Sequence, residues 1–314
     1  MKCLITGING FAASHLAEYL LSQGHEVYGT KRLRSNDLNI NHLDGQMKMC
    51  LMDLHDPIGV ELVILNIKPD VIFHLAAQSF VAMSYSHPIE TFQTNVLGTV
   101  YLLEAVRKYS PETRVHIASS SQIYGKTEDQ PMGKNTLFNP MQPYDSSKLA
   151  QDMIGLQYFN SYGLKVIRTR AFNNSGPRRG ESFAESNWSK QIALIEKGKQ
   201  EPVIKHGNLE SWRDYIDVRD TVKCYAKAAI EGTPGEVYIV GTGDPHSMRD
   251  VLETLLFYSD EPIQAEQDPA RMRPSDTPYM KADTSDMPWL LNGGKLIRFE
   301  QTMEDLLNFW RDKV

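Results

Sequence analysis

The chain has 314 residues, 41% of them hydrophobic and 23% charged, so it can bury a sizeable core in one large or two moderate domains. Its formal net charge of -6 argues against general binding of nucleic acid, which needs clustered positive charge. No apolar run is long enough to cross a membrane, and no signal peptide precedes the strand expected at residues 2–6. Cys3, Cys50 and Cys224 are scattered through apolar stretches, which predicts buried thiols and no metal site. We therefore expect a soluble, cytoplasmic protein that holds anionic ligands through local arginines and backbone amides.

The N-terminal residues follow the order strand, glycine turn, helix, strand. An apolar strand at 2–6 leads through Gly7 and Gly10 into an amphipathic helix, and a second strand spans 25–30. In this context Gly7 permits a tight turn, and Gly10 lets the backbone approach a pyrophosphate at the helix N-terminus. Ala13 replaces the third glycine of the pattern, at a position that serves helix–strand packing. The unit predicts dinucleotide binding, and the alternative is a β-α-β unit without a ligand.

The residues after the second strand indicate which dinucleotide is bound. A fold that selects NAD usually places Asp or Glu there to bind the ribose hydroxyls. Here residues 30–35 contain Lys31, Arg32 and Arg34 and no acid. Such a patch suits a 2′-phosphate, so NADP(H) is favoured over NAD(H); the alternative is a solvated basic loop.

Strands and helices continue to alternate along the first half of the chain. Further strands are expected at 48–52, 71–75, 115–118 and 165–169, and helices at 57–67, 89–109 and 144–162. This alternation predicts an α/β fold, a doubly wound parallel sheet of the Rossmann type. Because such sheets bind ligands at the carboxyl ends of their strands, one crevice should collect Gly7, Asp53, Ala76, Ser120 and Asn173.

The pattern changes after residue 174. The expected elements are a loop at 175–180, a helix to about 198, a β-rich stretch at 203–209, a helix through 230, a strand at 236–240, a helix to about 259 and a last helix at 302–310. The helix that ends near 259 should open with a capping box at Ser247–Asp250. We expect an NADP-binding domain of residues 1–174 and 214–244, to which the strand at 236–240 returns. Residues 175–213 and 245–314 would form a smaller, discontinuous α/β domain for the substrate.

Tyr144 and Lys148 lie four residues apart in a helix that opens with Pro143, so they share one face. The preceding strand ends in Ser119–Ser121, where Ser120 could hydrogen-bond a reacting oxygen. Lys148 and an oxidised nicotinamide would stabilise a Tyr144 phenolate, which could exchange a proton with an alcohol or ketone while hydride moves. Alone, Tyr-x-x-x-Lys is more often a solvated helix face, and a lone Ser120 a turn hydroxyl.

Together the motifs resemble those of the extended short-chain dehydrogenase/reductases, in the NAD-dependent epimerase/dehydratase family that acts on nucleotide sugars. The matching pieces are Thr6-Gly7-x-x-Gly10-x-x-Ala13, Asp53-Leu54, His74-Leu75-Ala76-Ala77, Asn95, Ser119-Ser120-Ser121, Tyr144-x-x-x-Lys148 and Arg213-Asp214-Tyr215-x-Asp217-Val218-x-Asp220. Stretches 200–210 and 268–276 are similar to GDP-4-keto-6-deoxy-mannose reductases. Stretches 77–81 and 175–180 are similar to GDP-mannose 4,6-dehydratases.

The resemblance implies three sets of site residues. The cofactor set is Gly7, Asn9, Gly10, Phe11, Arg32, Arg34, Asp53, Leu54, Leu75, Ala76, Ala77, Asn95, Tyr144 and Lys148. The substrate set is Ser79, Ser84, Asn173, Arg178, Arg179, Arg213, Arg273 and Asp276, and the catalytic set is Ser120, Gln122, Tyr144 and Lys148. Arg213 and Arg273 would bind the diphosphate, Asp276 a ribose hydroxyl, and Asn95 would help to align Lys148. The resemblance also implies a homodimer through helices 89–109 and 144–162, with a tetramer left open.

Gln122 departs from the family pattern. Dehydratases of this group carry glutamate there, two residues before Tyr124, as the base that removes the C5 proton and drives elimination of water. An amide cannot be a general base, whereas hydride transfer at C4 does not need one at this position. Asp145, where relatives often have glycine, is expected on an exposed helix face.

We therefore expect NADPH-dependent reduction of the C4 ketone of a GDP-4-keto-6-deoxy-hexose. One alternative is a 4,6-dehydratase or a nucleotide-sugar epimerase with tightly bound NADP. In a dehydratase, another residue would substitute for the base, or Gln122 would itself stand in place of a native glutamate. The other alternative is a catalytically inactive nucleotide-sugar-binding protein, against which stand Ser120, Tyr144 and Lys148.

Overall fold

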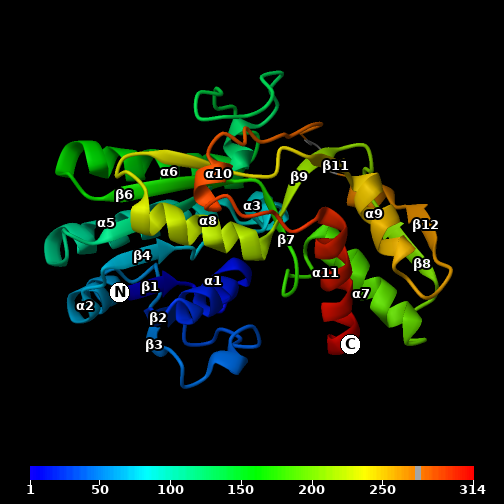
Figure 1. The fold of residues 1–314 in the computed structure, drawn as a ribbon, viewed down its shortest axis with the longest axis horizontal. Coiled ribbons are helices and arrows are strands. Elements are labelled where there is room, and N and C mark those ends of the chain that lie inside the picture. The colour runs from blue at the N-terminus through cyan, green and yellow to red at the C-terminus, as the bar shows by residue number, and fades with distance from the viewer. Residues whose placement is uncertain (273–276) are drawn as a thin grey trace.

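A parallel sheet of seven strands forms the centre of the molecule, in the order β10-β6-β5-β4-β1-β2-β3 (Figure 1). The computed structural model describes residues 1–272 and 277–314, so Arg273 and Asp276 lie outside the described residues. The strands are β1 (Lys2–Thr6), β2 (Glu26–Lys31), β3 (Lys48–Leu51), β4 (Val71–His74), β5 (Arg114–Ser120), β6 (Val166–Ala171) and β10 (Val237–Val240). Every neighbouring pair in this sheet is parallel, which confirms the doubly wound sheet predicted from the sequence.

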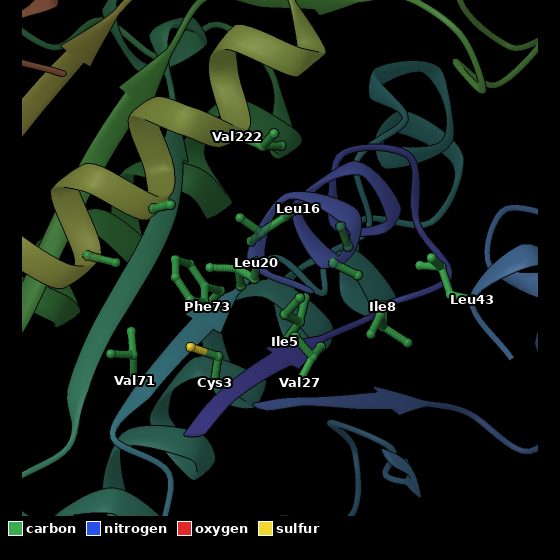
Figure 2. Packing of buried hydrophobic residues seen from close by; sticks show 14 of the residues in the cluster. Cys3, Ile5, Ile8, Leu16, Leu20, Val27, Leu43, Val71, Phe73 and Val222 are labelled. Carbon is green, nitrogen blue, oxygen red and sulfur yellow. The ribbon is translucent and has the colours of Figure 1, made fainter. Parts of the chain in front are cut away.

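Helices cover both faces of the sheet because successive side chains of each strand point to opposite sides. On one face, Cys3 and Ile5 of β1 pack with α1 (Phe11–Ser22) and α8 (Val218–Glu231), as Figure 2 shows for Leu16, Leu20 and Val222. On the other face, Leu4 packs with residues of α2 (Pro57–Ile67), α5 (Gly98–Tyr109) and α6 (Pro143–Tyr162). The sheet is thus buried on both faces, as expected from its continuous apolar strands.

The helix expected at 89–109 is one helical run interrupted by a π turn. It consists of α4 (Pro88–Phe92), a π-helical segment (Gln93–Leu97) and α5, and it follows a short helix that the sequence did not predict, α3 (Val81–Ser86). Single π turns inside α-helices are frequent at functional sites, and this one contains Asn95.

A further apolar cluster joins α7 (Ala184–Glu196), α9 (Met248–Phe257) and α11 (Phe299–Lys313), beside the paired strands β8 (Val203–His206) and β12 (Gln264–Gln267) (Figure 1). A small sheet of β7 (Asn173–Ser175), β9 (Trp212–Asp217) and β11 (Pro245–Ser247) lies between the two parts. The remaining elements are α10 (Met287–Leu290) and the 3-10 segments Asn41–Leu43, Ser121–Tyr124 and Pro269–Arg271.

Two expectations about the second half are confirmed. The Ser247 hydroxyl accepts from the Asp250 N–H at 3.0 Å and the Asp250 carboxylate accepts from the Ser247 N–H at 2.7 Å, which is the predicted capping box of α9. Strand β10 pairs with β6, so the chain does return to the large sheet. The division into two domains remains a prediction. Among the described helices, none combines the length and apolarity that a membrane crossing requires.

Candidate active site

A cleft of about 1000 Å³ follows the carboxyl ends of the central strands. Its floor includes Gly7, Asp53, Ala76, Ser120 and Asn173, so the structure brings together the residues that the strand-end argument placed in one crevice. The second half of the chain also lines the cleft, through residues that include Trp188, Lys205, Arg213 and Arg271.

The turn after β1 forms a cradle that side chains would fill. Gly7 has φ +67°, and a Cβ on it would lie 3.0 Å from Ala76 Cα, so glycine is required on both counts. A Cβ on Gly10 would lie 3.0 Å from the Gly7 carbonyl oxygen. The first residues of α1, among them Phe11 and Ala13, also line the cleft. Backbone amides at this helix N-terminus suit the pyrophosphate of a dinucleotide.

The basic patch after β2 differs from the expectation in one respect. Lys31 and Arg32 line the cleft, whereas Arg34 is exposed and does not. Lys31 forms an ion pair with Asp37, because the chain turns back after β2 and brings this acid to the patch. Within the patch, Arg32 lines the cleft and is not part of this ion pair. The other predicted cofactor residues on the cleft are Asn9, Leu54, Leu75 and Ala77.

Ser120, Gln122, Tyr144 and Lys148 meet on the cleft where β5 ends and α6 begins. The Ser120 hydroxyl accepts from the Gln122 N–H at 3.2 Å and is hydrogen-bonded to Tyr144. Burial raises the pKa of Tyr144 to about 12, opposed by the Ser120 hydrogen bond and by the positive charge of Arg179. The phenol is thus held in its protonated form at neutral pH.

Lys148 is buried, and its ammonium has two hydrogen-bond partners within the protein. Its ammonium donates to the Ala118 carbonyl at 2.5 Å and to the Gln151 side chain. Burial lowers the Lys148 pKa to about 8, against the charge of Asp152. The sequence assigned stabilisation of a Tyr144 phenolate to Lys148, and this role stays a prediction. In the structure, Ser120 and Arg179 lower the Tyr144 pKa, and Lys148 lines the same cleft.

Asn95 does not line the cleft but connects two elements that do. Its amide oxygen accepts from the Gln78 N–H at 2.8 Å, and its amide nitrogen donates to the Gln78 carbonyl at 3.0 Å and to the Ser147 hydroxyl at 2.9 Å. It therefore ties the loop after β4 to the residue before Lys148. Sequence reasoning gave Gln78 no role in the site, although it lies in the stretch 77–81 that resembles the dehydratases.

The predicted substrate residues divide into two groups. Ser79, Asn173, Arg179 and Arg213 line the cleft. Ser84 does not, because it is fully buried in α3 and donates to the Val81 carbonyl at 2.7 Å. Arg178 also faces away from the cleft.

The two adjacent arginines point in different directions. Arg178 has φ 72° and forms an ion pair with Glu18 of α1 at 2.6 Å. Arg179 lies 3.4 Å from the ring centroid of Phe183 and bonds Glu185 at 3.3 Å. Arg213, expected in a loop, lies in β9 and donates to the Thr277 carbonyl at 2.6 Å.

The carboxylates on the described part of the cleft are Asp53, Glu90, Glu181 and Glu185. Glu185 is paired with Arg179, and Glu181 with Lys190. The side-chain nitrogen of Gln122 lies 3.7 Å from the Met280 sulfur. A neutral side chain thus occupies the position at which dehydratases of this group carry the glutamate base.

The expectation for Asp145 was wrong. It is 1% exposed, its carboxylate accepts from the Met141 N–H at 3.1 Å, and burial raises its pKa to about 6. Its place in the first turn of α6, folded back on the preceding residues, removes it from solvent, and it does not line the cleft.

Comparison with known proteins supplies the family. Residues 4–305 match the family model described as GDP-mannose 4,6 dehydratase. GDP-mannose 4,6-dehydratase of Vibrio cholerae serotype O1 is 33% identical over 261 residues, which cover 80% of this chain and 69% of that protein. GDP-6-deoxy-D-mannose reductase of Pseudomonas aeruginosa is 28% identical over 315 residues, which cover 100% of this chain and 98% of that protein.

Two solved structures share the fold over the whole length of both chains. RMD from Pseudomonas aeruginosa, complexed with NADPH, superposes with a TM-score of 0.83 at 25% identity and 100% coverage of each chain. UDP-glucose 4-epimerase of Thermus thermophilus, in complex with NAD, superposes with a TM-score of 0.88 at 29% identity and the same coverage. The recognition of an epimerase/dehydratase-type fold is confirmed.

Proposed function

This chain belongs to the GDP-mannose 4,6-dehydratase family, and we propose that within it the protein is an NADPH-dependent reductase of the C4 ketone of a GDP-4-keto-6-deoxy-hexose. One observation carries the choice of reaction: Gln122, an amide, lies on the cleft beside Ser120 and Tyr144 where elimination needs a carboxylate. Reduction needs a proton donor and a hydride donor, and the site contains the proton donor.

The cofactor we propose is NADP(H), which supplies hydride from its nicotinamide. The cradle of Gly7 and Gly10 would hold the pyrophosphate, and Asp53 would lie near the adenosine. Arg32 would bind a 2′-phosphate by its fork of N–H groups. NADPH is also the cofactor in the reductase structure that this chain resembles.

Tyr144 is suited to protonate the ketone oxygen as hydride adds to C4. Its raised pKa keeps the proton on the phenol until the developing alkoxide takes it, so carbon gains hydride, oxygen gains a proton, and an alcohol results. Ser120 would hydrogen-bond the same oxygen and orient it toward Tyr144. The charge of Arg179 then stabilises the phenolate that remains.

The substrate's diphosphate would lie against the arginine-bearing wall. Arg179 and Arg213 line the cleft from opposite parts of the second half, and arginine suits phosphate oxygens. Arg178, which is occupied by Glu18, is omitted from this set.

A 4,6-dehydratase is the second candidate, favoured by the family model and by the 33% identical relative. In that reaction a base would remove the C5 proton after oxidation at C4. Of the four described cleft carboxylates, Glu181 and Glu185 are paired with Lys190 and Arg179, which leaves these two poorly suited to that task.

The test compares two incubations of the purified protein. One contains a GDP-4-keto-6-deoxy-hexose and NADPH; the other contains GDP-mannose and a catalytic amount of NADP. We expect NADPH consumption in the first and no loss of water from the sugar in the second. A 4-keto-6-deoxy product in the second would assign the dehydratase reaction instead.

A further inference from the structure

Behind Lys148, a series of buried, hydrogen-bonded polar side chains crosses the interior to the end of β1, next to the glycine turn. Its members are Gln151, Thr99, His74 and Thr6, each no more than 1% exposed. They come from α6, α5, β4 and β1, so four elements contribute one side chain each. Buried polar groups are costly unless bonded, and here they bond one another.

Thr99 anchors the part of this series that lies next to Lys148. Lys148 donates to the side-chain oxygen of Gln151, Oε1. The side-chain nitrogen of Gln151, Nε2, donates to the Thr99 hydroxyl at 2.8 Å. The Thr99 hydroxyl in turn donates to the Asn95 carbonyl at 2.7 Å and lies 3.0 Å from His74 Nε2. Because the Thr99 proton goes to Asn95, Thr99 must accept from both Gln151 and His74.

The other half fixes the tautomer of His74. The Thr6 hydroxyl accepts from the N–H groups of Leu75 at 3.1 Å and Ala76 at 3.0 Å, so its own proton goes to His74 Nδ1 at 3.0 Å. His74 therefore carries its proton on Nε2 and donates it to Thr99, an assignment that follows from the bonding partners. Burial and the charge of Lys148 lower the His74 pKa to about 3, which keeps the ring neutral.

This order of protons has a consequence for Gln151. An amide can present either its oxygen or its nitrogen, and the nitrogen would repel an ammonium. Since Thr99 needs a donor, Gln151 must turn its oxygen to Lys148. The Ala118 carbonyl takes a second proton of the ammonium at 2.5 Å. One of the three protons is left for the cleft, which Lys148 lines.

We propose that Gln151, oriented by Thr99 and His74, is a positioning residue that fixes the Lys148 ammonium beside Tyr144, whose phenolate Lys148 is expected to stabilise together with Arg179. The inference deepens the proposed function, on which its catalytic consequence rests, because it concerns the same Lys148. Through Thr6, the same series of hydrogen bonds connects Lys148 with Ala76, whose N–H donates to the Thr6 hydroxyl. Ala76 lines the cleft next to the cofactor cradle.

Gln151 is the side chain that accepts from Lys148, because the nearby acid is bonded to other groups. On α6, Asp152 acts on Lys148 through its charge, but its carboxylate is bonded by Arg168 at 2.8 Å and Arg170 at 3.0 Å. From the strands, the neutral rings of His74 and His116 face Lys148, and burial lowers the pKa of each to about 3.

Three further groups face the neighbouring Tyr144. Asp145 on the same helix raises the pKa of the phenol, and Arg179 in the loop after β7 lowers it. Tyr225 on α8 also faces Tyr144, and its own pKa is raised by burial. None of the three bonds the Lys148 ammonium, so a change at Gln151 should be read first at Lys148.

The experiment compares Gln151→Leu, which removes the acceptor, with Gln151→Glu, which makes it an anion. The readout is the titration midpoint of Lys148, followed by NMR of 13C-labelled lysine and identified by the signal that Lys148→Met loses. A hydrogen bond to a charged group is worth roughly one to two pKa units, so the midpoint should fall by about one unit in Gln151→Leu and rise by about one in Gln151→Glu. Turnover with NADPH should fall roughly tenfold to a hundredfold in Gln151→Leu. Gln157→Leu, on the exposed face of the same helix, is the matched control and should change neither.

Midpoints that move in the same direction in both variants, or do not move, would overturn the proposal, because a purely structural amide predicts no opposite shifts. Thr99→Val keeps Gln151 but removes its anchor, so it should lower the midpoint in the same direction as Gln151→Leu; it decides the matter if the latter does not fold. The NMR readout needs no turnover. A wild-type protein that reduces no ketone would refute the proposed function, while the midpoints would still decide the role of Gln151.

Discussion

Replacement of Tyr144 by phenylalanine removes one hydroxyl from the cleft and keeps the ring. Positioned general acids contribute roughly 100-fold to 10,000-fold, so kcat for ketone reduction should fall by that factor, about 3 to 5 kcal/mol in activation free energy. The hydroxyl bonds Ser120, and a single hydrogen bond contributes about 1 kcal/mol to stability. The loss of activation free energy should therefore exceed the loss of unfolding free energy several-fold.

The assay measures NADPH consumption with the ketone substrate, alongside urea unfolding and a fluorescence titration of NADPH binding. Tyr109→Phe is the matched control, because the Tyr109 hydroxyl bonds Glu61 at 3.0 Å away from the cleft. We expect the control to retain full turnover at a similar cost in stability. Unchanged turnover in Tyr144→Phe, or an equal loss in both variants, would refute the role of the phenol.

Three further predictions follow from single side chains. The Gln122→Glu variant should catalyse some elimination of water from GDP-mannose with catalytic NADP, seen by mass spectrometry. If the variant eliminates no water, the amide of Gln122 is not what prevents elimination. The buried Asp145 carboxyl, with its pKa raised to about 6, favours the protonated form in the folded state, so its contribution to stability is lost as pH rises from about 4 to about 6. Asp145→Asn should accordingly be more stable than wild type above pH about 6, by roughly 2 kcal/mol in urea unfolding, and equal to it below pH about 4; equal stability throughout would contradict this. If the helices at 89–109 and 144–162 form a homodimer, Ile89→Asp, at a side chain 73% exposed, should halve the mass measured by light scattering, whereas a monomeric wild type would remove the premise.

The central sheet could be predicted from sequence because parallel strands buried on both faces are short, continuous apolar runs. Strands expected at 71–75 and 236–240 are found at Val71–His74 and Val237–Val240, within a residue at each end. Helix α3 was missed because Val81–Ser86 has neither a capping residue nor an apolar period. The π turn contains Asn95, whose side chain bonds residues distant in sequence, and no local pattern encodes those bonds.

The sequence predicted which residues meet at the site only where the fold topology determines their position. Ser120 and Ala76 follow strands of a parallel sheet, so their meeting at one edge follows from the fold. Arg178 and Arg179 are adjacent and chemically identical, yet a left-handed turn directs one to Glu18 and the other to the cleft. Gln151 carried no motif, because its role arises from a series of hydrogen-bonded side chains that three other elements contribute.

The proposed reaction is tested most directly by NADPH labelled with deuterium at the transferred position. Incubated with a GDP-4-keto-6-deoxy-hexose, the protein should deliver one deuterium to C4 of the product, seen by NMR, with none at C5 or C6. An unlabelled product, or an untouched ketone together with loss of water from GDP-mannose, would contradict the assignment of a reductase.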